Sequence, residues 1–396
     1  MQRFFRIPLI KKKKNKMKFF YSVISIVFLF FACRQAKQSE LPEFQVDTNK
    51  DIALPLSEIT DEIMIIEPEL TDESLINYGY NGTGIRRMIK TENHIIVAMG
   101  GLASQNIVLV FNLDGKFVRS IGTRGQGPGE HNLLQNMAFD DKNRQLFILS
   151  ADPNKIICYH LDGMFVKESR LNQGCFYFDI NYFNNELFFE CFVMGGNVSK
   201  KIVYRMNNNL QLTDSIICWK NSFEGRMNDT HIFMDYLVKN GTSMYVYPKE
   251  LYMKWNTPNI KVLRDTLYRV EDNQLIPELK LKFRNNGFDG YGDKIINLHN
   301  LYRSSRYIFA FYEYNPNNRE RTTEQAKRYF FCYDTKTGQG YNMLDGYKDD
   351  IHGIEERVYI HPLTTDSEYF YYCYPQINPN DREEPNPTLY IGKLKK

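Results

Sequence analysis

One phrase that recurs five times constrains the fold of this chain more than any other feature. Each copy is an apolar strand that ends near an aromatic residue, followed by a polar turn and a second strand. The turns carry Asp-Gly, Asn-Asn, Asp-Asn or Thr-Gly, which are residues that tight β-hairpins favour. The copies lie at 109–122, 157–169, 202–216, 266–281 and 330–344. A unit that repeats in this way buries its apolar side only against neighbouring copies.

The spacing of these hairpins predicts a ring of blades. The aromatic residue recurs at Phe111, Tyr159, Tyr204, Tyr268 and Tyr333. Four-stranded propeller blades take roughly 40–50 residues each, and loop insertions account for any excess. Further strand-like segments lie between the hairpins, at 93–100, 145–152, 186–193, 244–249, 307–314 and 368–374.

We therefore predict an all-β fold, a six-bladed β-propeller with four-stranded blades. The segment 57–69 is strand-like but belongs to none of the six blades. A ring must join its two chain ends, or it leaves open strand edges. We expect this N-terminal segment to pair with the last blade, beside the strand at 388–394. The predicted blades span 84–122, 131–170, 175–217, 230–283, 295–344 and 352–395.

The N-terminus has the parts of a secretory signal. Eight basic and no acidic side chains lie in residues 1–32, and an apolar run occupies 19–32. This run is shorter than the roughly 20 residues that a membrane-spanning helix needs. It ends at Ala32-Cys33, which resembles the lipidation site of bacterial lipoproteins; a plain signal peptide or an uncleaved anchor is the alternative. We expect a signal peptide at 1–32, a flexible linker at 33–50 after lipidated Cys33, and the propeller at 51–396.

Charge and cysteine usage narrow the partners further. Without residues 1–32 the chain carries 42 basic and 47 acidic groups, a net charge of −5. This balance argues against nucleic acid or an anionic lipid surface as the main partner. Most of the six cysteines after Cys33 lie in apolar strand-like runs, where a free thiol behaves as a small buried hydrophobe. We expect no disulfides among them.

The region around the first two hairpins resembles a known family. The runs FNLDGKF (111–117) and GTRGQGPGE (122–130), with the first strand PLSEITDEIMIIEPEL, are similar to the six-bladed β-propeller lipoproteins of Gram-negative bacteria with NHL-like repeats. The resemblance covers roughly 51–395 and is strongest over 105–170. It implies a propeller fold and a location in the cell envelope, at the outer membrane. It implies no particular activity.

The glycines of GTRGQGPGE permit two interpretations. They could cradle a phosphate, but no Lys-Ser or Lys-Thr follows them and Pro128 removes one backbone donor. We therefore predict a tight crossover between blades. Arg124 and Glu130 flank it, and either pair with each other or face a ligand.

The seven histidines show no spacing that places two on one face of an element. His131, His231 and His361 each lie near the predicted start of a blade, where a propeller brings side chains toward its axis. Some NHL-like lyases hold a metal in that channel. We expect neither a metal nor another cofactor here.

Arginines near the expected channel suggest a ligand site. We expect Arg86 and Arg87 to open the first blade and Arg303 and Arg306 to open the fifth. Guanidinium groups bind carboxylates, and aromatic faces bind the apolar side of sugars. The alternative is a structural network with acidic groups of neighbouring blades. The full set of candidate ligand residues is Arg86, Arg87, Arg124, Glu130, His131, Tyr177, Arg303, Arg306, Tyr359 and His361.

Two function hypotheses follow. The first is a non-catalytic binding or scaffold lipoprotein of the cell envelope, which recognises a glycan, a peptide or a partner protein, such as an outer-membrane transport complex, at one propeller face. The second is a metal-dependent lyase or lactonase with its site in the channel. No hydrolase motif of the G-x-S-x-G or H-E-x-x-H type occurs, so binding is favoured over catalysis.

Overall fold

The computed structural model describes most of the chain from residue 40 onward. The chain divides into two compact units, 1–41 and 42–396, and only residues 40 and 41 of the first are described. Every element named below belongs to the second unit. Cys33, and with it the predicted lipidation site, lies outside the described residues. The described ranges are 40–48, 50–77, 84–101, 105–195, 198–222, 230–231, 237–249, 252–253, 263–292, 294–316, 326–375 and 385–396.

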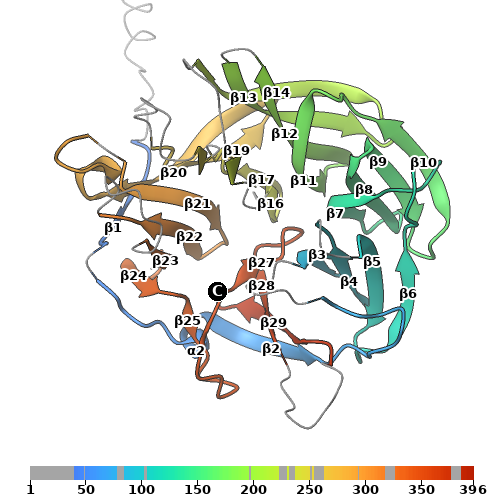
Figure 1. Cartoon of the computed structure of the whole chain (residues 1–396). Coiled ribbons are helices and arrows are strands. Elements are labelled where there is room, and N and C mark those ends of the chain that lie inside the picture. Colours follow the sequence, from blue (N-terminus) through green and yellow to red (C-terminus); the bar gives the residue numbers. More distant parts are fainter. Residues whose placement is uncertain are drawn as a thin grey trace, which may run out of the picture. The chain divides into compact units, whose positions relative to one another are not determined.

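Six sheets form the blades of a β-propeller, and each has four antiparallel strands that are given below from the centre outward (Figure 1). This confirms the predicted fold class. The first three blades are β3 (Ile85–Lys90), β4 (His94–Met99), β5 (Ile107–Asn112) and β6 (Phe117–Ile121); β7 (Leu133–Asp140), β8 (Gln145–Asp152), β9 (Asn154–His160) and β10 (Phe165–Arg170); and β11 (Cys175–Phe183), β12 (Glu186–Gly195), β13 (Val198–Asn207) and β14 (Leu212–Ser222).

The other three blades follow the same order. The fourth holds β16 (Leu237–Asn240), β17 (Ser243–Val246), β19 (Thr266–Glu271) and β20 (Gln274–Phe283), and the fifth holds β21 (Ile296–Arg303), β22 (Tyr307–Tyr314), β23 (Lys327–Asp334) and β24 (Gln339–Leu344). The sixth holds β27 (His361–Pro362), β28 (Tyr369–Tyr374), β29 (Thr388–Leu394) and β2 (Thr60–Ile66). Two short ladders lie in connections: β15 (Thr230–His231) with β18 (Tyr252–Met253), and β25 (Tyr347–Lys348) with β26 (Arg357–Val358).

The ring is closed by strand β2, as the sequence predicts. β2 pairs antiparallel with β29, and the register runs from Thr60 opposite Leu394 to Ile66 opposite Leu389. The last blade therefore takes its outermost strand from the start of the propeller. Because two distant parts of the chain share one sheet, neither end presents an open edge at this point.

The segment before β2 differs from the expected flexible linker. Residues 43–46 form β1 (Glu43–Val46), which pairs parallel with β20 as a fifth strand of the fourth blade. The chain then bonds to the fifth blade, where the N–H of Ile52 donates to the carbonyl of Asn342 at 2.9 Å. A single turn, α2 (Leu56–Ile59), leads into β2. We call residues 43–66 the N-terminal arm; it contacts blades four, five and six.

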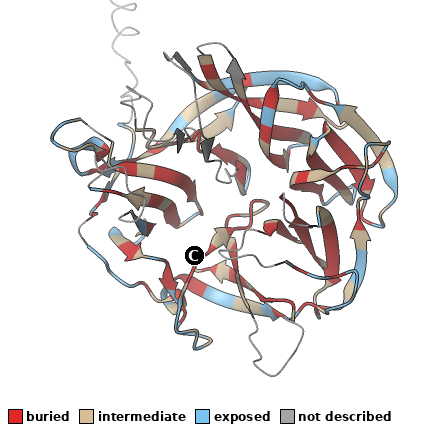
Figure 2. Ribbon diagram, viewed as in Figure 1, coloured by how far each residue is buried: buried red, intermediate tan, exposed pale blue. Residues whose placement is uncertain are grey.

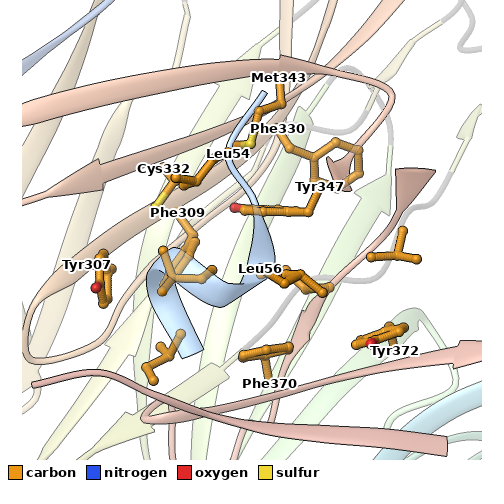
Figure 3. Close-up of a cluster of buried hydrophobic side chains, with 14 of the residues drawn as sticks. Leu54, Leu56, Tyr307, Phe309, Phe330, Cys332, Met343, Tyr347, Phe370 and Tyr372 are labelled. Carbon is orange, nitrogen blue, oxygen red and sulfur yellow. The ribbon is translucent and has the colours of Figure 1, made fainter. Parts of the chain in front are cut away.

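The hydrophobic core is divided into clusters between successive blades. Figure 2 shows buried residues along the inner strands and exposed ones mainly on the outer strands. One cluster joins the fifth and sixth blades to the N-terminal arm (Figure 3). In it Leu54 and Leu56 of the arm pack with Tyr347 and Phe370. The arm is thus part of the core and not only an edge strand.

The cysteines of the described residues are free, as predicted. Burial raises the pKa of Cys158 to about 11, which keeps its thiol protonated near neutral pH. Within the described part of the chain, helix is limited to short segments such as α2 and η1 (Arg284–Gly287). None of the described helices is long and apolar enough to cross a membrane.

The packing of the arm predicts the effect of Leu56→Ala. Leu56 is fully buried, so the change leaves a cavity between blades five and six. We expect the free energy of unfolding to fall by about 2–5 kcal/mol in urea denaturation. The control is Leu75→Ala, because Leu75 is 41% exposed and its removal changes stability by no more than about 0.5 kcal/mol. Equal effects of the two variants would contradict this role of the arm.

Candidate binding face and channel

The two ends of the propeller differ in the length of their connections. Since the strands of each blade are antiparallel, the turns between its first and second and between its third and fourth strands share one end. We call it the tight-turn end. Its turns have two to six residues and are 91–93, 113–116, 141–144, 161–164, 184–185, 208–211, 241–242, 272–273, 304–306, 335–338 and 363–368.

The other end, which we call the long-connection end, carries the second-to-third-strand connections and the links between blades. Three of them are short, namely residue 153 alone, 171–174 and 196–197. The others are longer and some contain elements of their own, and they span 67–84, 100–106, 122–132, 223–236, 247–265, 284–295, 315–326, 345–360 and 375–387. Binding residues commonly lie on variable loops that a rigid scaffold holds in position.

A repeated β-bulge shapes the channel wall. Four innermost strands shift register at equivalent places, at Arg86, Gln135, Phe178 and His299. Each bulge is followed by a buried polar residue, and these are Arg87, Asn136, Asp179 and Asn300. A bulge re-aims the side chains next to it. The inner strands thereby bring polar groups together at the axis, which the sequence pattern alone did not indicate.

Arg87 and Asp179 form the centre of this axial network. Both side chains are almost fully buried and are joined by an ion pair between blades one and three. The Arg87 guanidinium also donates to the carbonyl of Met137 in blade two, at 2.8 Å. The second carboxylate oxygen of Asp179 accepts from the backbone N–H of Leu237 in blade four. One buried pair therefore connects four blades.

The turn 363–368 of blade six bonds across the ring to other blades at the tight-turn end. The carbonyl of Thr364 accepts from Asn181 Nδ2 at 2.8 Å and from the N–H of Lys239 at 2.9 Å. Ser367 Oγ donates to the carbonyl of Arg303 at 2.6 Å. The turn is thus bonded to blades three, four and five, and in Figure 1 it reaches toward the centre of the ring. We call residues 363–368 the axial plug.

The four predicted arginines do not gather at one mouth, contrary to the sequence-based expectation. Arg86 and Arg87 open β3, whereas Arg303 ends β21 and Arg306 follows it at the tight-turn end. Arg303 pairs with a carboxylate of Glu278 in blade four at 2.7 Å. For Arg87 and Arg303 the structure supports the alternative interpretation, in which the arginines belong to a structural network with acidic side chains.

Arg306 is held by a carboxylate of its own blade. Its Nη2 lies 2.6 Å from Asp334 Oδ2, and its Nε donates to the other oxygen at 2.9 Å. This two-point contact lowers the pKa of Asp334 to about 2. Such a fork is a strong pairing and leaves little donor capacity for a ligand.

The predicted tyrosines lie in the core and not at the mouth. Tyr177 is 3% exposed and packs against Phe189, with ring centroids 5.9 Å apart. Tyr359 is half-buried and stacks on Phe330 at 5.0 Å, in the cluster of blades five and six. The alternation of apolar and polar residues along a strand shows which side chains share one face. It does not show which face packs against a neighbouring blade, so the sequence analysis misassigned these two tyrosines.

The glycine-rich segment is a crossover from β6 to β7, as predicted. Glu130 turns its carboxylate into its own loop, where it accepts from the N–H of Gly127 at 2.8 Å. Gly125 has a φ of +153°, and a Cβ there would lie 2.1 Å from Glu130 Oε2. The glycine therefore makes room for the carboxylate. Arg124 is exposed at the long-connection end.

The histidines near blade starts do not form one cluster. His131 is fully buried and its Nε2 lies 2.9 Å from the carbonyl of Asn106. His361 stacks on Tyr371, and burial lowers its pKa to about 4. The side chain of His231 lies outside the described residues. Among the described residues no three His, Cys, Asp or Glu are placed to hold a metal ion.

A buried cluster of Lys249, His299 and Glu313 was missed by the sequence analysis. His299 Nδ1 lies 3.1 Å from Lys249 Nζ, and its Nε2 lies 3.2 Å from Glu313 Oε2. Burial, together with the Lys249 charge, lowers the pKa of His299 to about 4. A neutral His299 thus accepts from the ammonium and donates to the carboxylate. The three residues come from different strands or connections, so no local motif marks them.

The chain matches a described family over nearly its whole propeller. Residues 41–396 match the domain of unknown function DUF4934, and the chain belongs to that family. It is a six-bladed β-propeller of unknown function. No curated protein matches it. The family match does not bear on NHL-like repeats or on lipidation, which stay predictions.

Solved structures resemble it distantly. A member of the DUF4221 family from Bacteroides vulgatus is 8% identical, with a TM-score of 0.46, and the match covers 85% of this chain and 97% of that one. A protein of unknown function from Bacteroides caccae is 12% identical, with a TM-score of 0.38 and coverages of 76% and 90%. The propeller domain of the trilobed protease from Pyrococcus furiosus is 11% identical, with a TM-score of 0.35 and coverages of 78% and 83%.

The axial network predicts that Arg87→Met is severely destabilising. The change leaves Asp179 buried without its ionic partner, which costs about 3–5 kcal/mol of unfolding free energy in chemical denaturation. Adding Asp179→Leu to Arg87→Met should recover part of the loss. The control is Lys116→Met, which removes an exposed ion pair with Glu69 and costs less than about 1 kcal/mol. A loss at Arg87 no larger than at Lys116 would contradict the role of the pair.

Proposed function

We propose that this chain is a non-catalytic binding or scaffold lipoprotein of the cell envelope. It recognises its ligand, a glycan, a peptide or a partner protein, at the long-connection end of the propeller. The observation that carries the proposal is the asymmetry between the two ends. Tight hairpins leave little surface to vary, whereas long connections on a rigid ring build a surface that can be adapted to a ligand.

The axial plug also favours the long-connection end as the binding face. Thr364 and Ser367 are almost fully buried and bonded to three other blades, so the channel is occupied at the tight-turn end. Both side chains of the Arg87–Asp179 pair are buried, and each satisfies the charge of the other. A ligand that approaches the channel therefore meets it from the long-connection end.

The envelope location is supported by the N-terminal sequence. A basic segment, an apolar run and Ala32-Cys33 follow one another as in exported lipoproteins. The negative net charge of the chain without residues 1–32 favours a glycan or protein ligand over nucleic acid. An outer-membrane transport complex is a partner that suits this location. No observation on the described residues favours the lyase or lactonase alternative.

The proposal predicts that binding depends on exposed aromatic residues at the long-connection end. Phe176, at the start of β11, is 50% exposed, and Tyr291, between blades four and five, is 75% exposed. We expect Phe176→Ala or Tyr291→Ala to weaken binding at least tenfold when the protein is screened on glycan and peptide arrays. Aromatic contacts at the centre of an interface commonly contribute this much.

The matched control for this prediction is Met164→Ala. Met164 is 61% exposed in the turn 161–164 at the tight-turn end, and its loss should leave binding unchanged. A ligand whose affinity falls with Met164→Ala but not with the two aromatic variants would place recognition at the wrong end and refute the proposal.

Lipidation predicts a separate result for Cys33→Ser. In a bacterial host, wild-type protein should incorporate labelled palmitate and sediment with membranes. Cys33→Ser should lose the label and most of the membrane association. Cys373→Ser serves as the control, because Cys373 lies within β28 and should not affect labelling. Label retained in Cys33→Ser would exclude this residue as the lipid site.

A further inference from the structure

Arg86 differs from the other arginines of the predicted ligand set that lie near the axis. Arg87, Arg303 and Arg306 each form an ion pair with a carboxylate. Among the described residues, none forms an ion pair or a hydrogen bond with the Arg86 guanidinium; its Nε, like that of Arg87, is buried without an acceptor. The Arg86 side chain as a whole is half-buried.

The local backbone positions this side chain at the long-connection end of blade one. Arg86 is the bulged residue of β3, between Ile85 and Arg87. Its Cγ lies against Gly100 and its guanidinium against Gly101, where β4 ends at the long-connection end. A Cβ on Gly101 would lie 2.7 Å from Nη2 of Arg86, and Gly101 has a φ of +113°. A glycine here therefore keeps space for the guanidinium at this end of blade one.

An anion at this position would lower the free energy of the buried Arg86 charge. Burial lowers the pKa of Arg86, and no described carboxylate offsets that effect. A partly desolvated charge without a counter-charge costs free energy, and an oxyanion that accepts from the guanidinium reduces that cost. Because Arg stays protonated in proteins, the site offers a permanent positive charge.

We propose that the Arg86 guanidinium binds an oxyanion, a carboxylate or a sulfate, of an acidic sugar recognised at the long-connection end. This inference rests on the proposed function and adds the chemistry of the ligand. The bidentate geometry of guanidinium suits planar and tetrahedral oxyanions alike. The axial network and the axial plug occupy the channel on the far side, so the anion reaches Arg86 from the long-connection end.

The test is a calorimetric titration of the full-length protein in mild detergent with glucuronate, with inorganic sulfate and with neutral glucose. We expect glucuronate or sulfate to bind, and the anion that binds identifies the group as carboxylate or sulfate. In Arg86→Met the affinity for that anion should fall at least tenfold. Arg86→Met should unfold at the wild-type temperature or above it, because no described ion pair is lost.

The matched control is Arg124→Met. Arg124 is exposed at the same end and the change removes the same charge, so affinity should stay within about twofold of the wild type. Equal losses of affinity in the two variants would show that only the overall electrostatic field of the protein attracts the anion. This result would overturn the inference. So would the failure of both anions to bind the wild-type protein.

A measurement on the wild-type protein makes the result independent of whether Arg86→Met folds. Phenylglyoxal modifies accessible arginines, and mass spectrometry locates the product. We expect the bound anion to slow modification of Arg86 at least fivefold and to leave Arg124 unaffected; no protection of Arg86 would overturn the inference. A neutral glycan that binds wild-type protein and Arg86→Met equally, and is lost in Tyr291→Ala, would overturn it while the proposed function stands.

Discussion

A buried ion pair at the axis holds the blades of this propeller together. Arg87 and Asp179 lie on the inner strands of blades one and three, and their remaining hydrogen bonds reach blades two and four. Charges at this depth are stable only when all their partners are in place. The pair therefore ties the inner strands of blades one to four to one another, and it depends on the bulges that direct both side chains to the axis.

The ring is completed by the N-terminal arm, which joins its late blades. β1 extends blade four, residues around Ile52 bond to blade five, and β2 supplies the outer strand of blade six. Leu54 and Leu56 place apolar side chains between blades five and six. Closure thus combines backbone pairing with burial of apolar surface, and the arm stabilises the part of the ring that the axial ion pair does not reach directly.

These constraints leave one end of the molecule free to vary. The axial plug and the tight hairpins fix the geometry at the tight-turn end, whereas the connections between blades carry most of the added length at the other. Of the arginines named from sequence near the axis, Arg87, Arg303 and Arg306 pair with carboxylates, whereas Arg86 pairs with none in the part of the chain that the structure describes. Their sequence positions look alike, and only their carboxylate partners, which come from other strands or blades, separate them.

The amino-acid sequence was sufficient to predict the fold class, the hairpins and the closing strand. These features follow from local pairs such as Asp114-Gly115 and from the alternation of apolar residues along strands such as β5, both of which act over a few residues. It did not determine β1, the axial network or the Lys249–His299–Glu313 cluster. Each of these joins residues far apart in the chain, and their contacts depend on how the blades are rotated about the axis. That rotation is set by packing of whole sheets, so only the tertiary structure could decide which polar side chains meet.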